Sequence, residues 1–291
     1  MKSKFTKLAC YSAPLRILAL LLILVICWLP IAAPIALLVK DQNLVTILTM
    51  PLLFVGFLVV IPRWGRWLHR DRHIWQTYGL VATRQNGMEL LQGLAIGLSS
   101  LFILFLLQGW LGWLQWQPLS WGVLKVVVEG SLTGLGTGFI EELVFRGWML
   151  DELQRDYSLK TSLWADSAIF AILHFGKPLS EAIRTAPQFP GLLLLGLTLV
   201  WAKRSTHSPQ TRLQHRREPS LGRLGLPIGL HAGFVWAYYI VNVGQLAQYT
   251  GRVPEWITGI DRNPLAGVLG LLLLSLLAGY MSWRSKQAVL G

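Results

Sequence analysis

Residues 137–148, TGFIEELVFRGW, lie in the middle of the chain. This stretch places two adjacent carboxylates, Glu141 and Glu142, and the guanidinium of Arg146 inside a segment that is otherwise apolar. An ionisable side chain at the centre of a bilayer costs about 3 kcal/mol even on insertion scales, so such residues persist where they are paired, hydrated or functional. The first question is therefore which of these three charged side chains have partners.

The composition on either side of this stretch is that of a membrane protein. Of the 291 residues, 53% are hydrophobic and only 14% are charged. Several apolar runs reach or approach the roughly 18–20 residues that a helix needs to cross a bilayer. We therefore predict an all-α fold, a polytopic membrane protein of about eight transmembrane helices that forms a single membrane domain over residues 1–291. The predicted segments are 15–39, 44–61, 90–111, 121–150, 162–176, 190–202, 226–243 and 264–283.

The basic residues indicate how the chain is oriented. The formal net charge is +12, but the Lys and Arg residues are divided among the connections instead of forming one patch, which argues against a nucleic-acid partner. Most of them belong to the N-terminus, the even-numbered connections and the C-terminus, so both termini are predicted to be cytoplasmic. A plasma membrane and a thylakoid or other organelle membrane fit equally. The odd-numbered connections hold only Lys40, Lys177, Arg184, Arg252 and Arg262.

The spacing of the charges leaves one carboxylate without a local partner. Glu142 and Arg146 are four residues apart, so their side chains can meet on one helix face. Glu141 lies about 100° further around the helix, where the segment offers no cation. Gly130, Gly134 and Gly138 precede it at intervals of four and predict a face on which another helix packs closely.

Two histidines are the candidate partners of Glu141. Of the 6 His, only His174 and His231 lie in or at the edge of apolar segments, on two other helices. A carboxylate in an apolar pocket can act as a general base towards water, and imidazoles can orient that water or stabilise an oxyanion. Two His and one carboxylate are also a common zinc set, so a metal at Glu141, His174 and His231 and a metal-free glutamate mechanism both remain open. Asp166 shares a helix face with Phe170 and His174, but we expect it to be an acid at the surface or the membrane interface.

Three motifs in order resemble the CPBP intramembrane proteases, which include the type II CAAX prenyl endopeptidases and bacteriocin-processing proteins. EELVFR fits EExxxR, FAILH fits FxxxH, which adds Phe170, and HAGFV fits the third, histidine-containing motif. The resemblance covers roughly residues 120–245, the expected catalytic core. It implies an endopeptidase whose site opens toward the cytoplasm. Glu141 would then activate water, Glu142 and Arg146 would brace the helix, and His174 and His231 would complete the polar cluster.

One position departs from the family pattern. Family proteases carry Asn or Asp four residues after the third-motif histidine, where it helps to stabilise the oxyanion, and this chain has Val235. The first hypothesis remains an endopeptidase that cleaves a membrane-associated protein. The second, which Val235 favours, is a catalytically weak or inactive member that acts as a membrane scaffold for a partner protein. A transporter would be expected to have inverted repeats, and the sequence has none that is evident.

Overall fold

The structure is a computed structural model that describes residues 8–207 and 222–290, and its long helices follow the apolar segments. Seven helical stretches within the described residues are long and apolar enough to cross a membrane: Ala13–Leu38, Asn43–His69, Arg84–Trp110, Gly122–Asp156, Leu179–Arg204, Gly225–Val243 and Val268–Ala288. The predicted segment 162–176 forms α8 (Leu159–Leu173), which at 15 residues is too short to be counted with them. The chain is thus an all-α polytopic membrane protein, as predicted.

The elements follow one another in a nearly continuous series of helices. The long helices are α2 (Ala13–Leu38), α3 (Gln42–Trp64), α5 (Arg84–Trp110), α6 (Gly122–Glu142), α10 (Phe189–Arg204), α12 (Gly225–Tyr238) and α14 (Val268–Leu290). Short helical elements connect or extend them: η1 (Gly65–His69), α4 (Ile74–Thr77), η2 (Leu143–Met149), α7 (Leu150–Asp156), α9 (Leu179–Thr185), η3 (Ala186–Gln188), η4 (Tyr239–Val243), α13 (Glu255–Thr258), η5 (Ile260–Arg262) and η6 (Pro264–Ala266). Two short strands, β1 (Leu114–Trp116) and β2 (Ala247–Tyr249), pair antiparallel.

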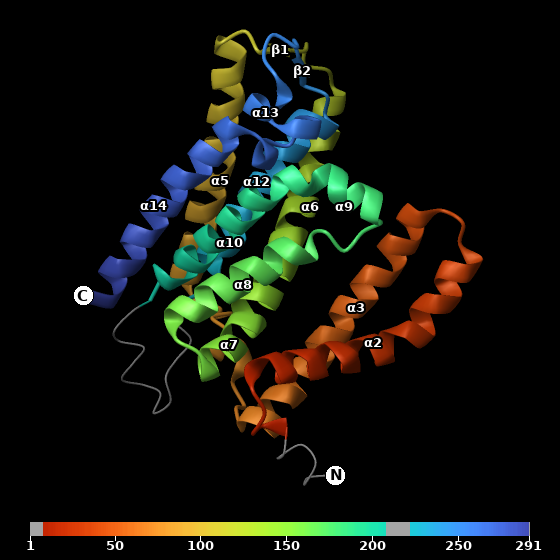
Figure 1. Cartoon of the computed structure of the whole chain (residues 1–291), viewed down its shortest axis with the longest axis vertical. Helices are drawn as coiled ribbons and strands as arrows, with labels where there is room; N and C mark the ends of the chain where they lie inside the picture. The colour runs from red at the N-terminus through yellow and green to blue at the C-terminus, as the bar shows by residue number, and fades with distance from the viewer. Residues whose placement is uncertain (1–7, 208–221, 291) are drawn as a thin grey trace.

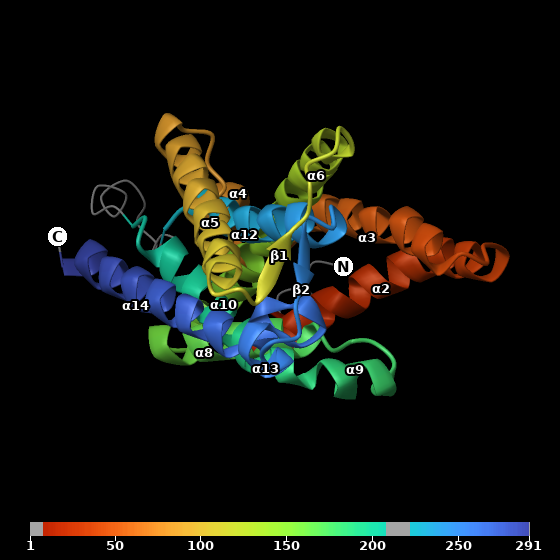
Figure 2. The same cartoon turned by 90° about the horizontal axis from the view of Figure 1, so that it is seen from above.

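Helix α12 lies at the centre of the bundle and packs against α5 and α6 (Figure 2). Glycines make this approach close. A Cβ built on Gly134 would lie 2.7 Å from the carbonyl oxygen of Ala232, and one on Gly138 would lie 2.8 Å from that of Ile228. Because real Cβ atoms do not come so close, only glycine allows this approach. The close-packing face predicted from the glycine spacing is confirmed.

Helices α6, η2 and α7 form one unbroken helical run over Gly122–Asp156. The π-helical part η2 begins at Leu143, directly after the two glutamates. A π-helical turn is wider than an α-helical one, so it changes the direction in which the following side chains point and is frequently found at functional sites. Here it turns Arg146 and Trp148 into the interior, where neither is exposed to solvent.

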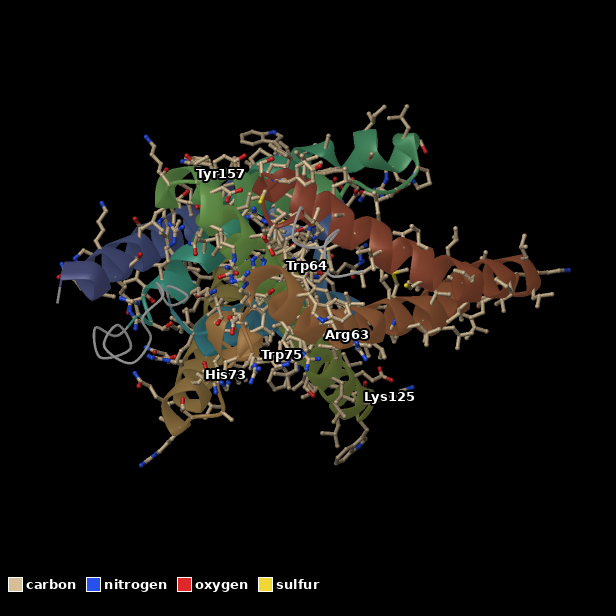
Figure 3. The ribbon with its side chains drawn as sticks, turned by 90° about the horizontal axis from the view of Figure 1, so that it is seen from below. Arg63, Trp64, His73, Trp75, Lys125 and Tyr157 are labelled. Carbon is tan, nitrogen blue, oxygen red and sulfur yellow. The ribbon has the colours of Figure 1, made fainter. Side chains whose placement is uncertain are left out.

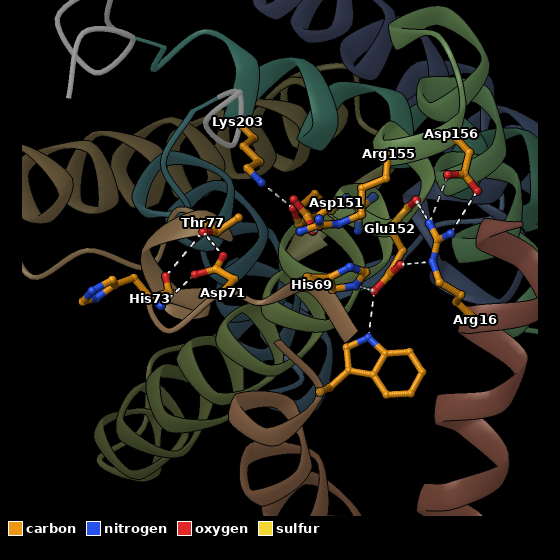
Figure 4. A network of polar contacts seen from close by, with 12 residues as sticks. Arg16, His69, Asp71, His73, Thr77, Asp151, Glu152, Arg155, Asp156 and Lys203 are labelled. Carbon is orange, nitrogen blue, oxygen red and sulfur yellow. Dashed lines mark hydrogen bonds and ion pairs between the residues drawn. The ribbon is translucent and has the colours of Figure 1, made fainter. Parts of the chain in front are cut away.

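The two N-terminal helices, α2 and α3, form a hairpin that stands to one side of the remaining bundle (Figure 1). Its main polar attachment is Glu152 of α7, a carboxylate with no solvent exposure. Glu152 accepts hydrogen bonds from Arg16 Nε at 2.8 Å and Trp64 Nε1 at 2.8 Å. His69 Nε2 lies 2.5 Å from it (Figure 4). We call these four residues the Glu152 cluster.

The two ends of the bundle differ in character. Strands β1 and β2 and helix α13 are grouped at one end, away from both chain termini (Figure 1). The other end carries the connection between α3 and α5, with His73 and Trp75, together with Arg63 at the end of α3 and Tyr157 (Figure 3). The predicted sixth connection, residues 203–223, lies partly outside the described residues.

Candidate active site

Glu141, His174 and His231 come together from three different helices. Glu141 lies at the end of α6, His174 caps α8, and His231 lies in the middle of α12. The Nε2 atoms of both histidines are 3.9 Å from the same carboxylate oxygen, Glu141 Oε2. That oxygen has no hydrogen-bond partner among the described residues. The three side chains therefore surround one point without bonding directly to each other, since 3.9 Å exceeds hydrogen-bond length.

The other nitrogen of each imidazole is already engaged. His174 Nδ1 lies 2.8 Å from the carbonyl oxygen of Phe170, and His231 Nδ1 lies 2.9 Å from Glu142 Oε1. Both partners are acceptors, so we assign the proton of each neutral ring to Nδ1. Each Nε2 then presents a lone pair toward Glu141. In this form neither ring has an N–H group left to donate at the site.

A buried ion-pair cluster contacts His231 on the side away from Glu141. Arg146 donates from Nη1 to Glu142 Oε1 at 3.2 Å and from Nη2 to the carbonyl oxygen of Gly196. Its Nε lies 3.6 Å from Asp166 Oδ2. Lys203 Nζ donates to the carbonyl oxygen of Arg146 at 2.6 Å. The side chains of Glu142, Arg146 and Asp166 are fully buried, so opposite charges compensate one another where no water does.

Phe170 fills the space between the ion-pair cluster and the imidazoles. Its ring lies 4.2 Å from Arg146 Cζ and 4.6 Å from the ring of His174, measured from ring centroids. The His231 ring is 6.2 Å away, in an edge-on arrangement. Phe170 is itself fully buried. The aromatic ring thus fixes the positions of both histidines relative to the guanidinium.

The three converging side chains line one end of a cavity of about 290 Å³. The rest of its wall is mostly apolar and includes Val235, and its other polar side chains are Thr137, Gln188, Tyr238 and Asn263. A pocket that is largely apolar with a few convergent polar groups is the usual form of a ligand site.

The pocket lies in the half of the bundle near β1 and β2. Its lining residues Gly270, Leu273 and Leu274 come from the start of α14, the end of that helix farthest from the C-terminus, and Tyr238 comes from the end of α12. If the termini are cytoplasmic, this pocket extends away from the cytoplasm. The two expectations, cytoplasmic termini and a site that opens toward the cytoplasm, are therefore not both met by this pocket.

The described residues fit a metal ion poorly. They contain no group of three or more His, Cys, Asp or Glu side chains arranged to hold one, and this includes Glu141, His174 and His231. No chemical step below is therefore assigned to a metal.

The structure also identifies supporting residues that the sequence pattern did not reveal. Asp166 was expected at the surface or interface, and this expectation is wrong: its side chain is fully buried beside Arg146. The signal was present, because Asp166 shares a helix face with Phe170 and His174. Lys203 follows the predicted segment 190–202 and so belongs to an even-numbered connection, yet it is only 1% exposed. No pattern in the sequence distinguishes it from the other cations near it.

One of three comparisons with known proteins found a match. No curated protein and no solved structure matches the chain. A model of one family, described as type II CAAX prenyl endopeptidase Rce1-like, matches residues 123–237. This segment contains Glu141, His174, His231 and most of their supporting residues. Over residues 123–237 the chain is similar to the Rce1-like type II CAAX prenyl endopeptidases, as its motifs predicted.

Proposed function

We propose that the chain is an intramembrane endopeptidase that hydrolyses a peptide bond of a membrane-associated protein. The observation that carries this proposal is the position of Glu141 Oε2, at 3.9 Å from the Nε2 atoms of both His174 and His231. One water oxygen can lie within hydrogen-bond distance of the carboxylate and an imidazole that are this far apart. The family match supports the same reaction class.

The reaction uses Glu141 as a general base and then as a general acid. A water molecule donates one hydrogen bond to Glu141 and one to an imidazole Nε2. Its oxygen attacks the peptide carbonyl carbon while Glu141 takes one water proton, and the carbonyl π electrons move onto the oxygen to give an oxyanion. When the intermediate collapses, the C–N bond breaks and Glu141 returns the proton to the leaving nitrogen. The products are a carboxylic acid and an amine.

The buried charges behind the site keep these groups in place. Glu142 accepts from both His231 Nδ1 and Arg146 Nη1, so it fixes the orientation of the imidazole and of the helix together. Positioning by a second layer of hydrogen bonds is what a catalytic group requires in order to act at the correct angle.

The proposal is tested with the purified full chain in lipid nanodiscs and an internally quenched, farnesylated peptide that ends in a C-a-a-X sequence. We expect Glu141→Gln to lower kcat by about 10²–10⁴-fold, the contribution typical of a positioned general base. Glu129→Gln is the matched control, because Glu129 lies on the same helix and is exposed. Equal cleavage by wild type and Glu141→Gln would contradict the proposal.

Val235 favours a second candidate function, a membrane scaffold that binds a partner protein without cleaving it. The apolar side chain stands in the pocket wall where family proteases have a hydrogen-bond donor. Quantitative proteomics of membrane-protein termini in cells that express wild type or Glu141→Gln separates the two functions. New protein termini that appear with wild type and not with Glu141→Gln support the protease. A partner protein whose abundance depends on this protein, and is the same with Glu141→Gln, supports the scaffold.

The orientation that we propose places both termini in the cytoplasm, with the pocket in the opposite half of the membrane. A variant that lacks Cys10 and Cys27 allows single cysteines to be labelled with a membrane-impermeant maleimide. We expect Tyr157→Cys to react from the cytoplasmic side and Arg262→Cys, next to Asn263 of the pocket, from the other side. Labelling of both cysteines from the same side would overturn this orientation.

A further inference from the structure

The site described above lacks a hydrogen-bond donor for the oxyanion. The Nδ1 protons of His174 and His231 are directed to the Phe170 carbonyl and to Glu142, so the neutral rings only accept at Nε2. The family position for a donor is filled by Val235. An oxyanion that forms in an apolar pocket without a donor would be strongly destabilised, and stabilisation at this point is usually the largest single contribution to catalysis.

Four other polar side chains line the same pocket: Thr137, Gln188, Tyr238 and Asn263. Three of them lie away from the reacting groups along the chain. Tyr238 is seven residues beyond His231, roughly 10 Å along a helix. Gln188 ends η3 and Asn263 precedes η6, so neither lies on the helices that carry the reacting groups. Thr137, in contrast, lies one helical turn from Glu141 on the same face of α6.

The packing of α6 on α12 sets Thr137 at the same height as His231. Gly138 approaches Ile228 and Ala232, while Gly134 approaches Ala232 and Trp236, so the two helices run in opposite directions. One turn backward along α6 therefore corresponds to one turn forward along α12. Thr137 lies one turn backward from Glu141. In this antiparallel register Thr137 lies level with His231, and Val235 lies one turn, about 6 Å, further along α12.

The hydroxyl of Thr137 is available for a ligand. Threonines inside other helices of this chain, such as Thr49 and Thr198, donate to the carbonyl oxygen four residues earlier. Among the described residues, Thr137 has no such bond and no other hydrogen-bond partner. It is half-buried and lines the pocket. Its O–H group is therefore an unengaged donor on a residue that lines the pocket one helical turn from Glu141.

We infer that Thr137 is the oxyanion donor of this chain. From the opposite helix it takes the role of the Asn or Asp that family proteases have at the position of Val235. As the water oxygen bonds to the carbonyl carbon and Glu141 takes the proton, the Thr137 hydroxyl donates a hydrogen bond to the oxygen that receives the π electrons. No proton leaves Thr137 during the cycle. This inference rests on the proposed endopeptidase function.

The test uses the same nanodisc preparation and farnesylated peptide. Thr137→Val keeps the shape of the side chain but removes the donor, and we expect kcat to fall by about 10²-fold with little change in KM. Thr137→Ser restores the hydroxyl and is expected to recover most of the rate. Thr133→Val, one turn further along α6 and exposed, is the control and should leave the rate unchanged.

A second substitution separates a donor from a merely structural residue. Val235→Asn places a donor at the family position, so we expect Thr137→Val to cost less than about tenfold in that background. If Thr137→Val costs the same with and without Val235→Asn, or has no effect on kcat while Glu141→Gln abolishes cleavage, the inference fails and the proposed function stands. If wild type and Glu141→Gln cleave equally, the proposed function fails and this inference with it.

Discussion

Glu141 and Glu152 belong to the same unbroken helical run, Gly122–Asp156, yet their surroundings are opposite. Glu152 is fully buried and has contacts at hydrogen-bond distance from Arg16, Trp64 and His69. Glu141 has 28% of its side chain exposed, and its Oε2 has no hydrogen-bond partner among the described residues. A carboxylate whose oxygens are all engaged is held as part of the fold. One with an unpartnered oxygen that faces a pocket can accept a proton from a substrate or from water.

This comparison predicts opposite outcomes for the same substitution at the two glutamates. Glu141→Gln should lower kcat by about 10²–10⁴-fold and leave the unfolding temperature nearly unchanged, because no hydrogen bond depends on the lost charge at Oε2. Glu152→Gln should lower the unfolding temperature but change kcat little. Peptide cleavage and thermal unfolding, measured on the same preparations, check both statements. Loss of activity in Glu152→Gln at a temperature where it is folded would contradict the comparison.

The Glu152 cluster should account for much of the attachment of the α2–α3 hairpin. Arg16→Ala leaves the buried Glu152 without its guanidinium, and breaking a buried ion pair in this way typically costs about 3–5 kcal/mol of unfolding free energy. Denaturant titration in micelles measures this loss.

A matched control is available on the surface of the same region. Arg155 pairs with Asp151 four residues earlier, and its side chain is 29% exposed. Arg155→Ala should cost less than Arg16→Ala, because the Arg155–Asp151 pair is partly exposed whereas Glu152 is fully buried. Equal losses for Arg16→Ala and Arg155→Ala would show that burial of the Glu152 cluster contributes nothing to stability.

Substitutions on the glycine face of α6 should have a smaller effect on stability. They change the packing of α6 on α12 and leave the charges of the site unchanged. Gly134→Val should cost about 1–3 kcal/mol, because its Cβ would come within 2.7 Å of the Ala232 carbonyl oxygen and force α12 away. Gly136→Ala is the control: nothing lies within 4 Å of its Cβ, so it should stabilise the helix by about 0.5 kcal/mol. Thermal unfolding of both variants in nanodiscs measures the difference. A Gly134→Val variant as stable as wild type would contradict the close packing of the two helices.

The contrast between the two glutamates also indicates what the sequence could and could not predict. Glu141 was recognisable because the spacing that pairs Glu142 with Arg146 leaves it without a cation. His174 and His231 were recognisable because they are the histidines in or at the edge of apolar segments. The Glu152 cluster was not recognisable, since its members lie on α2, on α3 with the adjoining η1, and on α7, and no local spacing links Arg16 to Glu152. The burial of Asp166 was missed for a related reason: its partner Arg146 seemed already neutralised by Glu142. Local periodicity predicts on which face of a helix a residue lies. Which other helix packs on that face depends on the tertiary fold.

The smallest expected effect concerns Phe170, whose ring lies between the buried Arg146 and the imidazole of His174. Phe170→Leu keeps an apolar side chain but removes the ring contacts with Arg146 at 4.2 Å and His174 at 4.6 Å, which together should be worth about 1 kcal/mol. Phe105, equally buried on α5, is the matched control for the loss of apolar volume alone. Because the ring also positions His174, kcat should fall in Phe170→Leu and not in Phe105→Leu. If both variants lose the same stability and neither loses activity, Phe170 is a packing residue only, and the imidazole is held by its backbone hydrogen bond to the residue 170 carbonyl, which the substitution leaves in place.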